Sequence, residues 1–318
     1  MAERGRGLGL VGAPIDFGAG RTGARMGPDA LRVAGLTTRL NSLGHAVRDD
    51  GNLLIDNDHV TDRLGSAVDV ARRLSAKTYE MMAEGLCPVI LGGDHALSMG
   101  SVAGVARATQ ERGQPLHVLW IDAHADYNTP SISPSGNPHG MSLALLCGEQ
   151  EFAPFIDSSW HAQVDPYAVT IFGARSIDRA ERALLRERGV DVVDMRLIDE
   201  MGAGALMRQA IERAAHAGAH LHVSFDVDVL DPTLAPGVGT TVPGGLTFRE
   251  AHLIMEMLHD SGLVGSLDVV ELNPAFDVHN RTATLAVDLI ESLFGKSTLV
   301  RRPVWDAPAK SPRSLSEA

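Results

Sequence analysis

The chain has 318 residues, 44% of them hydrophobic and 21% charged, which is enough for one large α/β domain or two small ones with a sizeable core. Its formal net charge of −12 argues against a nucleic-acid partner and against an anionic membrane surface. No apolar run approaches the roughly 18 residues of a membrane span, and the first residues lack the apolar core of a secretion signal. Two cysteines are too few for a disulfide framework, so we expect a cytoplasmic protein with Cys87 and Cys147 in its core.

Short apolar runs alternate with amphipathic stretches along the chain. The expected strands are 8–12, 88–92, 116–122, 169–172, 190–194, 221–226 and 266–272. The expected helices are 27–43, 61–85, 97–112, 200–217 and 247–260. This alternation predicts a mainly parallel sheet with helices on both faces. No composition shift divides the chain, so we expect one domain over residues 1–300 and a loosely ordered tail over residues 301–318.

Acidic and imidazole side chains stand at the ends of four predicted strands. They are His95; Asp122, His124 and Asp126; Asp226 and Asp228; and Glu271. Parallel strands end at a common edge of the sheet, where functional groups of α/β proteins collect. These side chains are therefore expected to meet.

The spacing within two of these groups bears on how many ions they hold. Asp122 and Asp126 would lie about 13 Å apart on a straight strand, which no single ion spans. Either the chain curls after His124 or the group serves more than one metal. Asp226 and Asp228, about 6.6 Å apart by the same arithmetic, suit two ions at the roughly 3.5–4 Å spacing of two-metal sites.

Metal binding competes here with a plainer explanation, because a single Asp-x-His or Asp-x-Asp is usually a cap or a turn. Six ligand-type residues at three strand ends are different, since unpaired buried charges would cost several kcal/mol each. The four carboxylates and two imidazoles, without a thiolate, favour manganese, with cobalt, iron or nickel as substitutes. Together with Glu271, two divalent ions and a bridging hydroxide would leave a negative pocket suited to a cation.

The stretches 92–95 (GGDH), 122–126 (DAHAD) and 224–232 (SFDVDVLDP) resemble the three metal signatures of the ureohydrolase family, which comprises arginases, agmatinases and relatives. The resemblance extends from about residue 9 to residue 295. It implies a three-layer α/β/α sandwich around a parallel sheet of about eight strands, and a binuclear manganese centre. It also implies a homo-oligomer, a trimer or a hexamer.

The same resemblance divides the ligands between two ions. One ion would be held by His95, Asp122, Asp126 and Asp226. The other would be held by Asp122, His124, Asp226 and Asp228. Asp122 and Asp226 are then the bridging carboxylates.

The loop after the second signature is similar to the arginase version, because it contains a Ser-Gly-Asn-x-His-Gly run at residues 135–140. By resemblance Asn128, Ser135 and Asn137 contact the α-carboxylate of L-arginine, and Ser133 stands where the family usually has threonine. Neutral donors suit a carboxylate, which agmatine lacks.

Further substrate contacts follow from the resemblance alone. Asp178 would meet the α-ammonium group, and Glu181 is a nearby acid that supports it. Ser176 replaces an aspartate that many arginases carry, which removes a negative charge near the amino group. Thr240 would line the metal pocket. His117 and His222 have no such context and are expected to be structural.

The implied mechanism is attack of a hydroxide that bridges two manganese ions on the guanidinium carbon, giving L-ornithine and urea. Glu271 would grip the guanidinium through paired hydrogen bonds. Asp126 would take up the proton and pass it to the leaving amine, and His139 would act as a proton shuttle.

Three alternatives remain at this stage. The first is another ureohydrolase acting on agmatine, guanidinobutyrate or formiminoglutamate, against which the Ser-Gly-Asn loop argues. The second is an amide hydrolase with one zinc ion, such as the related deacetylases, which would need only part of the ligand set. The third is a non-catalytic metal-binding subunit, whose signature would be broken ligands, and none of the six is broken.

Overall fold

The computed structural model describes residues 5–57 and 59–298. Its centre is a sheet of eight strands in the order β2-β1-β3-β8-β7-β4-β5-β6, and every pair of neighbours is parallel. The strands are β1 (Gly7–Ala13), β2 (Ala46–Asn52), β3 (Cys87–Gly92), β4 (Leu116–Ile121), β5 (Val169–Ala174), β6 (Asp191–Asp194), β7 (His220–Asp226) and β8 (Val264–Val270). The expectation of a parallel sheet of about eight strands is therefore confirmed.

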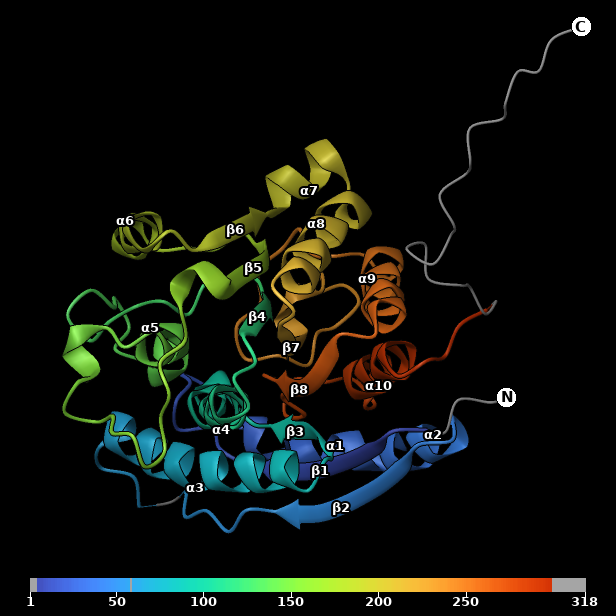
Figure 1. The fold of residues 1–318 in the computed structure, drawn as a ribbon, viewed down its shortest axis with the longest axis horizontal. Helices are drawn as coiled ribbons and strands as arrows, with labels where there is room; N and C mark the ends of the chain where they lie inside the picture. Colours follow the sequence, from blue (N-terminus) through green and yellow to red (C-terminus); the bar gives the residue numbers. More distant parts are fainter. Residues whose placement is uncertain (1–4, 58, 299–318) are drawn as a thin grey trace, which may run out of the picture.

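Helices cover both faces of this sheet (Figure 1). They are α1 (Gly27–Val33), α2 (Leu36–Ser42), α3 (Arg63–Ala83), α4 (Ser98–Glu111), α5 (Ser142–Leu146), α6 (Arg179–Arg188), α7 (Met195–Met201), α8 (Ala203–His216), α9 (Phe248–Ser261) and α10 (Arg281–Leu293). Buried residues of α3, α4, α5 and α6 belong to one apolar cluster, and those of α1, α2, α8, α9 and α10 belong to another. The two clusters are the two cores of a three-layer α/β/α sandwich.

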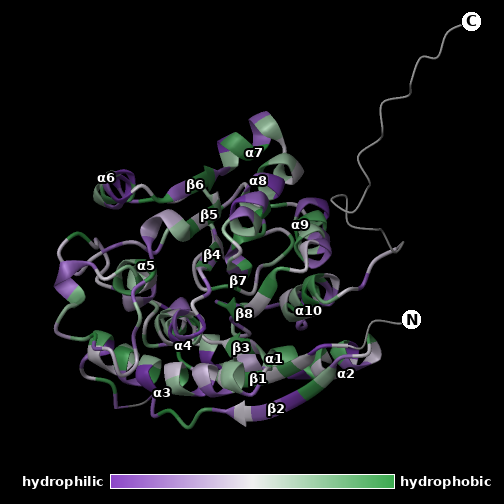
Figure 2. Ribbon diagram, in the orientation of Figure 1, coloured by the Kyte–Doolittle hydropathy of each residue, from purple (hydrophilic) through white to green (hydrophobic). Residues whose placement is uncertain are grey.

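Helix α3 shows how the sequence builds one of these outer layers. Asp62 caps its N-terminus by accepting a hydrogen bond from the backbone N–H of Gly65 at 3.0 Å. Apolar side chains such as Leu74 and Met81 are buried on one face, whereas the opposite face is exposed. Green and purple segments accordingly alternate along α3 in Figure 2. This pattern is typical of an amphipathic helix that packs on a sheet.

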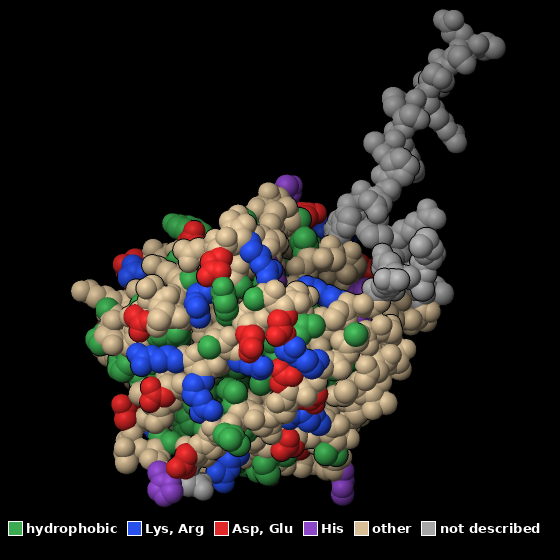
Figure 3. Space-filling view, turned by 60° about the horizontal axis from the view of Figure 1, so that its bottom comes forward, with side chains coloured by type: hydrophobic (Ala, Val, Ile, Leu, Met, Phe, Trp, Pro, Cys, Tyr) green, Lys and Arg blue, Asp and Glu red, His purple; other side chains and the backbone are tan. Residues whose placement is uncertain are grey.

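Strand β2 was not predicted from the sequence. It is an edge strand with an exposed, charged sequence, so the apolar alternation that reveals a strand is missing. Its charges are paired locally, with Arg48 Nε 3.0 Å from Asp50 Oδ1 and Lys77 Nζ 2.9 Å from Asp50 Oδ2. Acidic and basic side chains are interspersed in the same way over the face shown in Figure 3.

The helix predictions need three corrections. The stretch 27–43 is two helices and not one, because Gly35 adopts a left-handed φ of 90° between them. The stretch 200–217 is likewise divided by Gly202 between α7 and α8. Helices α5, α6 and α10 were not predicted at all. The tail expected over residues 301–318 lies outside the described residues, and among those described no helix is long and apolar enough to cross a membrane.

Candidate metal centre

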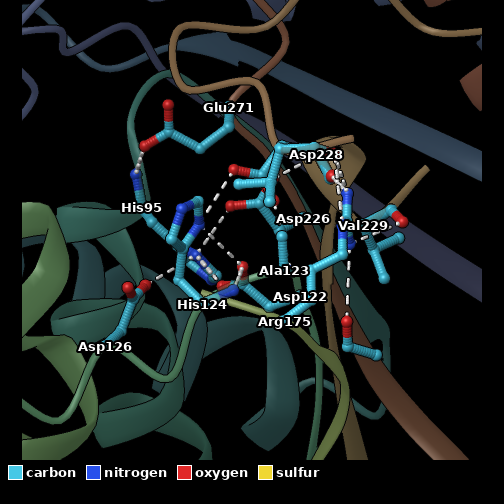
Figure 4. Close-up of polar contacts among 12 residues, drawn as sticks. His95, Asp122, Ala123, His124, Asp126, Arg175, Asp226, Asp228, Val229 and Glu271 are labelled. Carbon is cyan, nitrogen blue, oxygen red and sulfur yellow. Dashed lines mark hydrogen bonds and ion pairs between the residues drawn. The ribbon is translucent and has the colours of Figure 1, made fainter. Parts of the chain in front are cut away.

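Four neighbouring strands in the middle of the sheet, β3, β8, β7 and β4, deliver the predicted ligands to one edge. His95 follows β3, Glu271 follows β8, Asp226 ends β7 and Asp122 follows β4. Because these strands are adjacent and parallel, their carboxyl ends converge, and Figure 4 shows the side chains pointing toward one another. The six predicted ligands and Glu271 are thus brought together.

The His95 imidazole is surrounded by three carboxylates. Its Nδ1 atom lies 3.1 Å from Asp122 Oδ2, 3.0 Å from Asp126 Oδ2 and 3.1 Å from Asp226 Oδ2. The same nitrogen is buried and has no hydrogen-bond partner among residues 5–57 and 59–298. A buried imidazole nitrogen that faces three carboxylate oxygens without bonding to any of them fits a divalent cation at their centre. The residues present therefore suit a divalent metal ion.

A second group of ligands shares Asp122 with the first. His124 Nδ1 lies 3.4 Å from Asp122 Oδ1 and 3.1 Å from Asp228 Oδ2. Asp122 thus presents Oδ2 to the His95 group and Oδ1 to the His124 group, which is the geometry of a bridging carboxylate. Asp226 faces the first group through Oδ2, while its Oδ1 accepts a hydrogen bond from the Asp228 backbone N–H at 2.7 Å.

The chain curls between His124 and Asp126, which resolves the spacing argument. Asp126 has a φ of 49°, in the left-handed region that non-glycine residues rarely occupy. This turn brings the Asp126 carboxylate back to the His95 group, where a straight strand would have carried it away. Glu271, with a φ of 62°, is a second site residue in the same strained region. Such strain concentrates at functional sites because the surrounding structure must enforce it.

Two neighbours that no sequence motif indicates orient His95. Its Nε2 atom lies 2.8 Å from Ser224 Oγ, which leaves Nδ1 facing the carboxylates. Its ring stacks on Trp120 with centroids 4.0 Å apart, and the indole N–H of Trp120 donates to Asp122 Oδ2 at 2.9 Å. Hydrogen bonds of this kind fix the tautomer and angle of a metal-binding histidine. Alternation along β4 and β7 places both residues on the ligand face, but only the strand register shows that they meet.

The carboxylates repel one another when no cation is bound. Burial, together with the charges of Asp228 and Asp122, raises the pKa of Asp226 well above its usual range. Burial also raises the pKa of Asp126, and the charge of Asp122 adds to it. Buried carboxylates that resist ionisation, as Asp226 and Asp126 do, are stabilised by binding divalent cations.

Glu271 and His139 form a pair at the rim of the metal centre. His139 Nδ1 lies 2.8 Å from Glu271 Oε1, which also accepts a hydrogen bond from the backbone N–H of His95 at 2.9 Å. The other oxygen, Oε2, is buried and has no hydrogen-bond partner in the part of the chain that the structure describes. A free carboxylate oxygen beside the metal ligands is suited to a cationic group of a substrate.

The loop from residue 128 to residue 140 carries the remaining predicted contacts. Asn128 is buried, and its Nδ2 donates to Asp178 Oδ2 at 3.2 Å. Its Oδ1 has no hydrogen-bond partner among the described residues. Glu181 supports this corner by accepting hydrogen bonds from the backbone N–H groups of Tyr127 and Asp178, and burial raises its pKa to about 7. The structure thus brings Asn128, Asp178 and Glu181 together.

The two serines of this loop have local partners. Ser133 Oγ accepts from the Gly136 N–H at 3.0 Å, and Ser135 Oγ accepts from the Asn137 N–H at 3.2 Å. These hydrogen bonds shape the tip of the loop, and the hydroxyl hydrogens remain available to a ligand. Thr240 is exposed and follows Gly239, which lies beside Glu271.

The residues set aside as structural behave as expected. His117 Nε2 lies 3.0 Å from Thr170 Oγ1, and His222 Nδ1 lies 2.9 Å from Ser266 Oγ, both inside the molecule. Cys87 and Cys147 are buried free thiols, and burial raises their pKa values to about 11 and about 12. A thiol of such high pKa is a poor nucleophile.

Comparisons with known proteins agree with this geometry. A family model described as the arginase family matches residues 6–295. An arginase of Brucella melitensis is 48% identical over 92% of this chain and 97% of its own length. The solved arginase of Bacillus cereus superposes with a TM-score of 0.84 at 41% identity, covering 92% of this chain and 99% of that one. The solved arginase of Entamoeba histolytica, in complex with L-ornithine, superposes with a TM-score of 0.85 at 26% identity, covering 93% of this chain and 100% of that one.

Proposed function

The chain belongs to the arginase family, and from this membership we propose that it hydrolyses L-arginine to L-ornithine and urea. The observation that carries the proposal is the pair of ligand groups that share Asp122, because it fits two divalent ions side by side. The Entamoeba relative was solved with L-ornithine, which is the amino-acid product of this reaction. The enzyme is accordingly a binuclear metal hydrolase that acts on a linear amidine.

The proposed ligand sets are those expected from the sequence. One ion is held by His95, Asp122, Asp126 and Asp226. The other is held by Asp122, His124, Asp226 and Asp228. The distances around His95 support the first set in full, and those around His124 support Asp122 and Asp228 in the second. We propose manganese as the metal because the donors are mostly carboxylate oxygens with two imidazoles.

When bound, the two ions supply an acidified water as nucleophile and positive charge at the reacting carbon. Glu271 binds the guanidinium through Oε2, which is free, and so fixes the electrophilic carbon over the ligand groups. Asp126 faces His95 through Oδ2, which leaves Oδ1 to act as base and acid. It takes up the proton that the attacking water loses and returns it to the leaving amine. His139, which is 18% exposed, carries protons between this site and solvent.

The loop selects the amino-acid end of the substrate in this proposal. The Nδ2 amide of Asn128 has two N–H donors, and its hydrogen bond to Asp178 uses one of them, so the other can donate to a carboxylate. We assign Asn128, Ser135 and Asn137 to the α-carboxylate, with Ser133 beside them. Asp178, hydrogen-bonded to Asn128, is assigned to the α-ammonium group.

The remaining assignments complete the site. Glu181 holds the Asn128–Asp178 corner through backbone hydrogen bonds, which supports a positioning role. Thr240 lies next to Gly239, whose position beside Glu271 supports a place at the edge of the pocket. We further propose a cytoplasmic homo-oligomer, a trimer or a hexamer, as the working form.

The proposal is tested by urea release. Protein loaded with Mn²⁺ is expected to release urea from L-arginine much faster than from agmatine or guanidinobutyrate. A chelator should abolish the activity, and added Mn²⁺ should restore it. Equal or preferred turnover of agmatine would refute the substrate assignment, and one zinc ion per chain by elemental analysis would refute the binuclear site.

A further inference from the structure

One arginine behind the metal centre joins the segments that carry its ligands. Arg175 follows β5, which is separated from β7 by β4. The ladder between β5 and β6 shifts register at Gly173, whose φ is 100° and where a Cβ atom would lie 2.5 Å from Val229 Cγ2. Such an irregularity redirects the chain that follows it. The Arg175 side chain is thereby aimed across the end of β4 toward the loop after β7, as Figure 4 shows.

Within the described part of the chain, the guanidinium of Arg175 donates only to backbone carbonyl groups. Its Nη2 lies 2.8 Å from the carbonyl oxygen of Asp228 and 2.8 Å from that of Val242. Its Nη1 lies 3.1 Å from the carbonyl of Val229, and its Nε lies 3.1 Å from that of Val242. A longer contact at 3.4 Å reaches Leu230. The planar donor fork thus ties the segment 228–230, which includes a metal ligand, to the later loop at residue 242.

The backbone of the same residue fixes the other ligand strand. The Arg175 N–H donates to the Ala123 carbonyl at 2.9 Å, and the Ser176 N–H donates to it at 3.0 Å. Ala123 stands between Asp122 and His124, and its own N–H donates to Asp228 Oδ1 at 3.3 Å. Residue 175 therefore contacts both segments that form the His124 ligand group.

The charge of Arg175 is also placed to act on the carboxylates. Among the described residues, no carboxylate forms an ion pair with its guanidinium, because its donors are taken by carbonyls. Burial lowers the pKa of Arg175, and the charges of Asp228 and Asp122 oppose that effect. The side chain stays cationic and faces the back of an acidic cluster.

We propose that Arg175 is a positioning residue of the metal centre, which holds Asp228 against Asp122 and His124 at the spacing that the second ion requires. The inference rests on the proposed binuclear function. A hydrogen-bond partner behind a metal ligand typically changes metal affinity 10- to 100-fold when it is removed. We therefore expect Arg175→Met to weaken the more loosely held of the two ions by at least about tenfold.

The test is a titration of metal-free protein with Mn²⁺ against a competing chelator, with no substrate present. Arg6→Met is the matched control, because Arg6 also donates to two backbone carbonyls, those of Val264 and Gly265, at the start of β8 and so at the other end of the strands from the metal centre. This control should leave both Mn²⁺ affinities unchanged. Arg175→Lys keeps the charge but lacks the planar fork, so its Mn²⁺ affinity should lie between that of Arg175→Met and that of the parent protein.

A second measurement separates positioning from general stability. The free energy of unfolding is measured with and without Mn²⁺, and their difference reports metal binding to the folded state. Arg175→Met should shrink this difference, whereas a purely structural role would lower both values equally. Unchanged Mn²⁺ affinities in Arg175→Met would overturn the inference. If Arg175→Met does not fold, Mn²⁺ affinities in Arg175→Lys equal to those of the parent protein would overturn it. Parent protein that binds fewer than two Mn²⁺ ions would instead refute the proposed function and the inference with it.

Discussion

The imidazole of His139 and the carboxylate of Glu271 are paired, with Nδ1 2.8 Å from Oε1. The pairing occupies one oxygen of Glu271 and leaves Oε2 buried without a partner. Burial opposes a charge on His139, but the carboxylates of Glu271, Asp126 and Asp94 raise its pKa to about 9. The residue assigned to bind the guanidinium and the residue assigned to carry protons thus form one unit.

Replacing the acid of this pair tests its role. Glu271→Gln keeps the shape and an acceptor but removes the charge that pairs with a guanidinium. We expect kcat/KM for L-arginine to fall at least about 100-fold, which corresponds to about 2.7 kcal/mol of transition-state stabilisation. Glu291→Gln is a matched control, since Glu291 is also a buried acid with cationic partners, Arg39 and Lys296, but lies on α10. Similar losses in both variants would contradict the assignment.

Substrate selection should depend on Asn128. Asn128→Ala removes a buried amide whose Nδ2 carries two N–H donors, one of which bonds to Asp178 Oδ2. A substrate whose carboxylate loses a hydrogen-bond donor of the protein binds more weakly, whereas a substrate without a carboxylate is little affected. We expect kcat/KM to fall about tenfold or more for L-arginine and to change little for agmatine. An equal loss for both substrates would show that Asn128 shapes the pocket without selecting the substrate.

The hydrogen bond from His95 to Ser224 should contribute to metal affinity. Ser224→Ala leaves the His95 ring without the partner at 2.8 Å that fixes its orientation. We expect about a tenfold loss of Mn²⁺ affinity, measured by chelator competition. Ser266→Ala is the control, because Ser266 is a buried strand serine bonded to His220 and His222, which bind no metal in this proposal. The prediction fails if both variants bind Mn²⁺ as the parent does.

The metal ligands could be predicted from the sequence because each follows an apolar strand, so a local pattern reports a position at the sheet edge. The partners of those ligands could not. Ser224, Trp120 and Arg175 are ordinary residues in their own segments, and their roles arise from strand register and from contacts between distant segments.

The fold shows the same division between local and distant information. Central strands such as β3 and β7 are buried throughout and were found as apolar runs. Strand β2 was missed because its charged sequence lacks apolar alternation and is held in place by distant segments: among the described residues it pairs with β1 alone, and its Asp50 forms an ion pair with Lys77 of α3. Helix α6 was missed because it is short and strongly charged, and its start is set by Asp178 and Glu181, which the sequence analysis interpreted as substrate contacts.

Acid should destabilise the metal-free protein through His117. This side chain is 5% exposed, and burial, with a smaller effect of Arg213, lowers its pKa to about 4 from about 6.5 when unfolded. The unfolded chain therefore binds a proton below pH 6.5 that the folded chain refuses, so stability is present above that pH and is lost as the pH falls toward 4. Between pH 7 and pH 5 we expect His117 to remove about 2 kcal/mol from the free energy of unfolding. Urea unfolding of the parent and of His117→Asn at both pH values isolates this effect, because the other titrating groups are common to both proteins. A difference between the two proteins that is the same at pH 7 and pH 5 would show that the buried imidazole does not resist protonation.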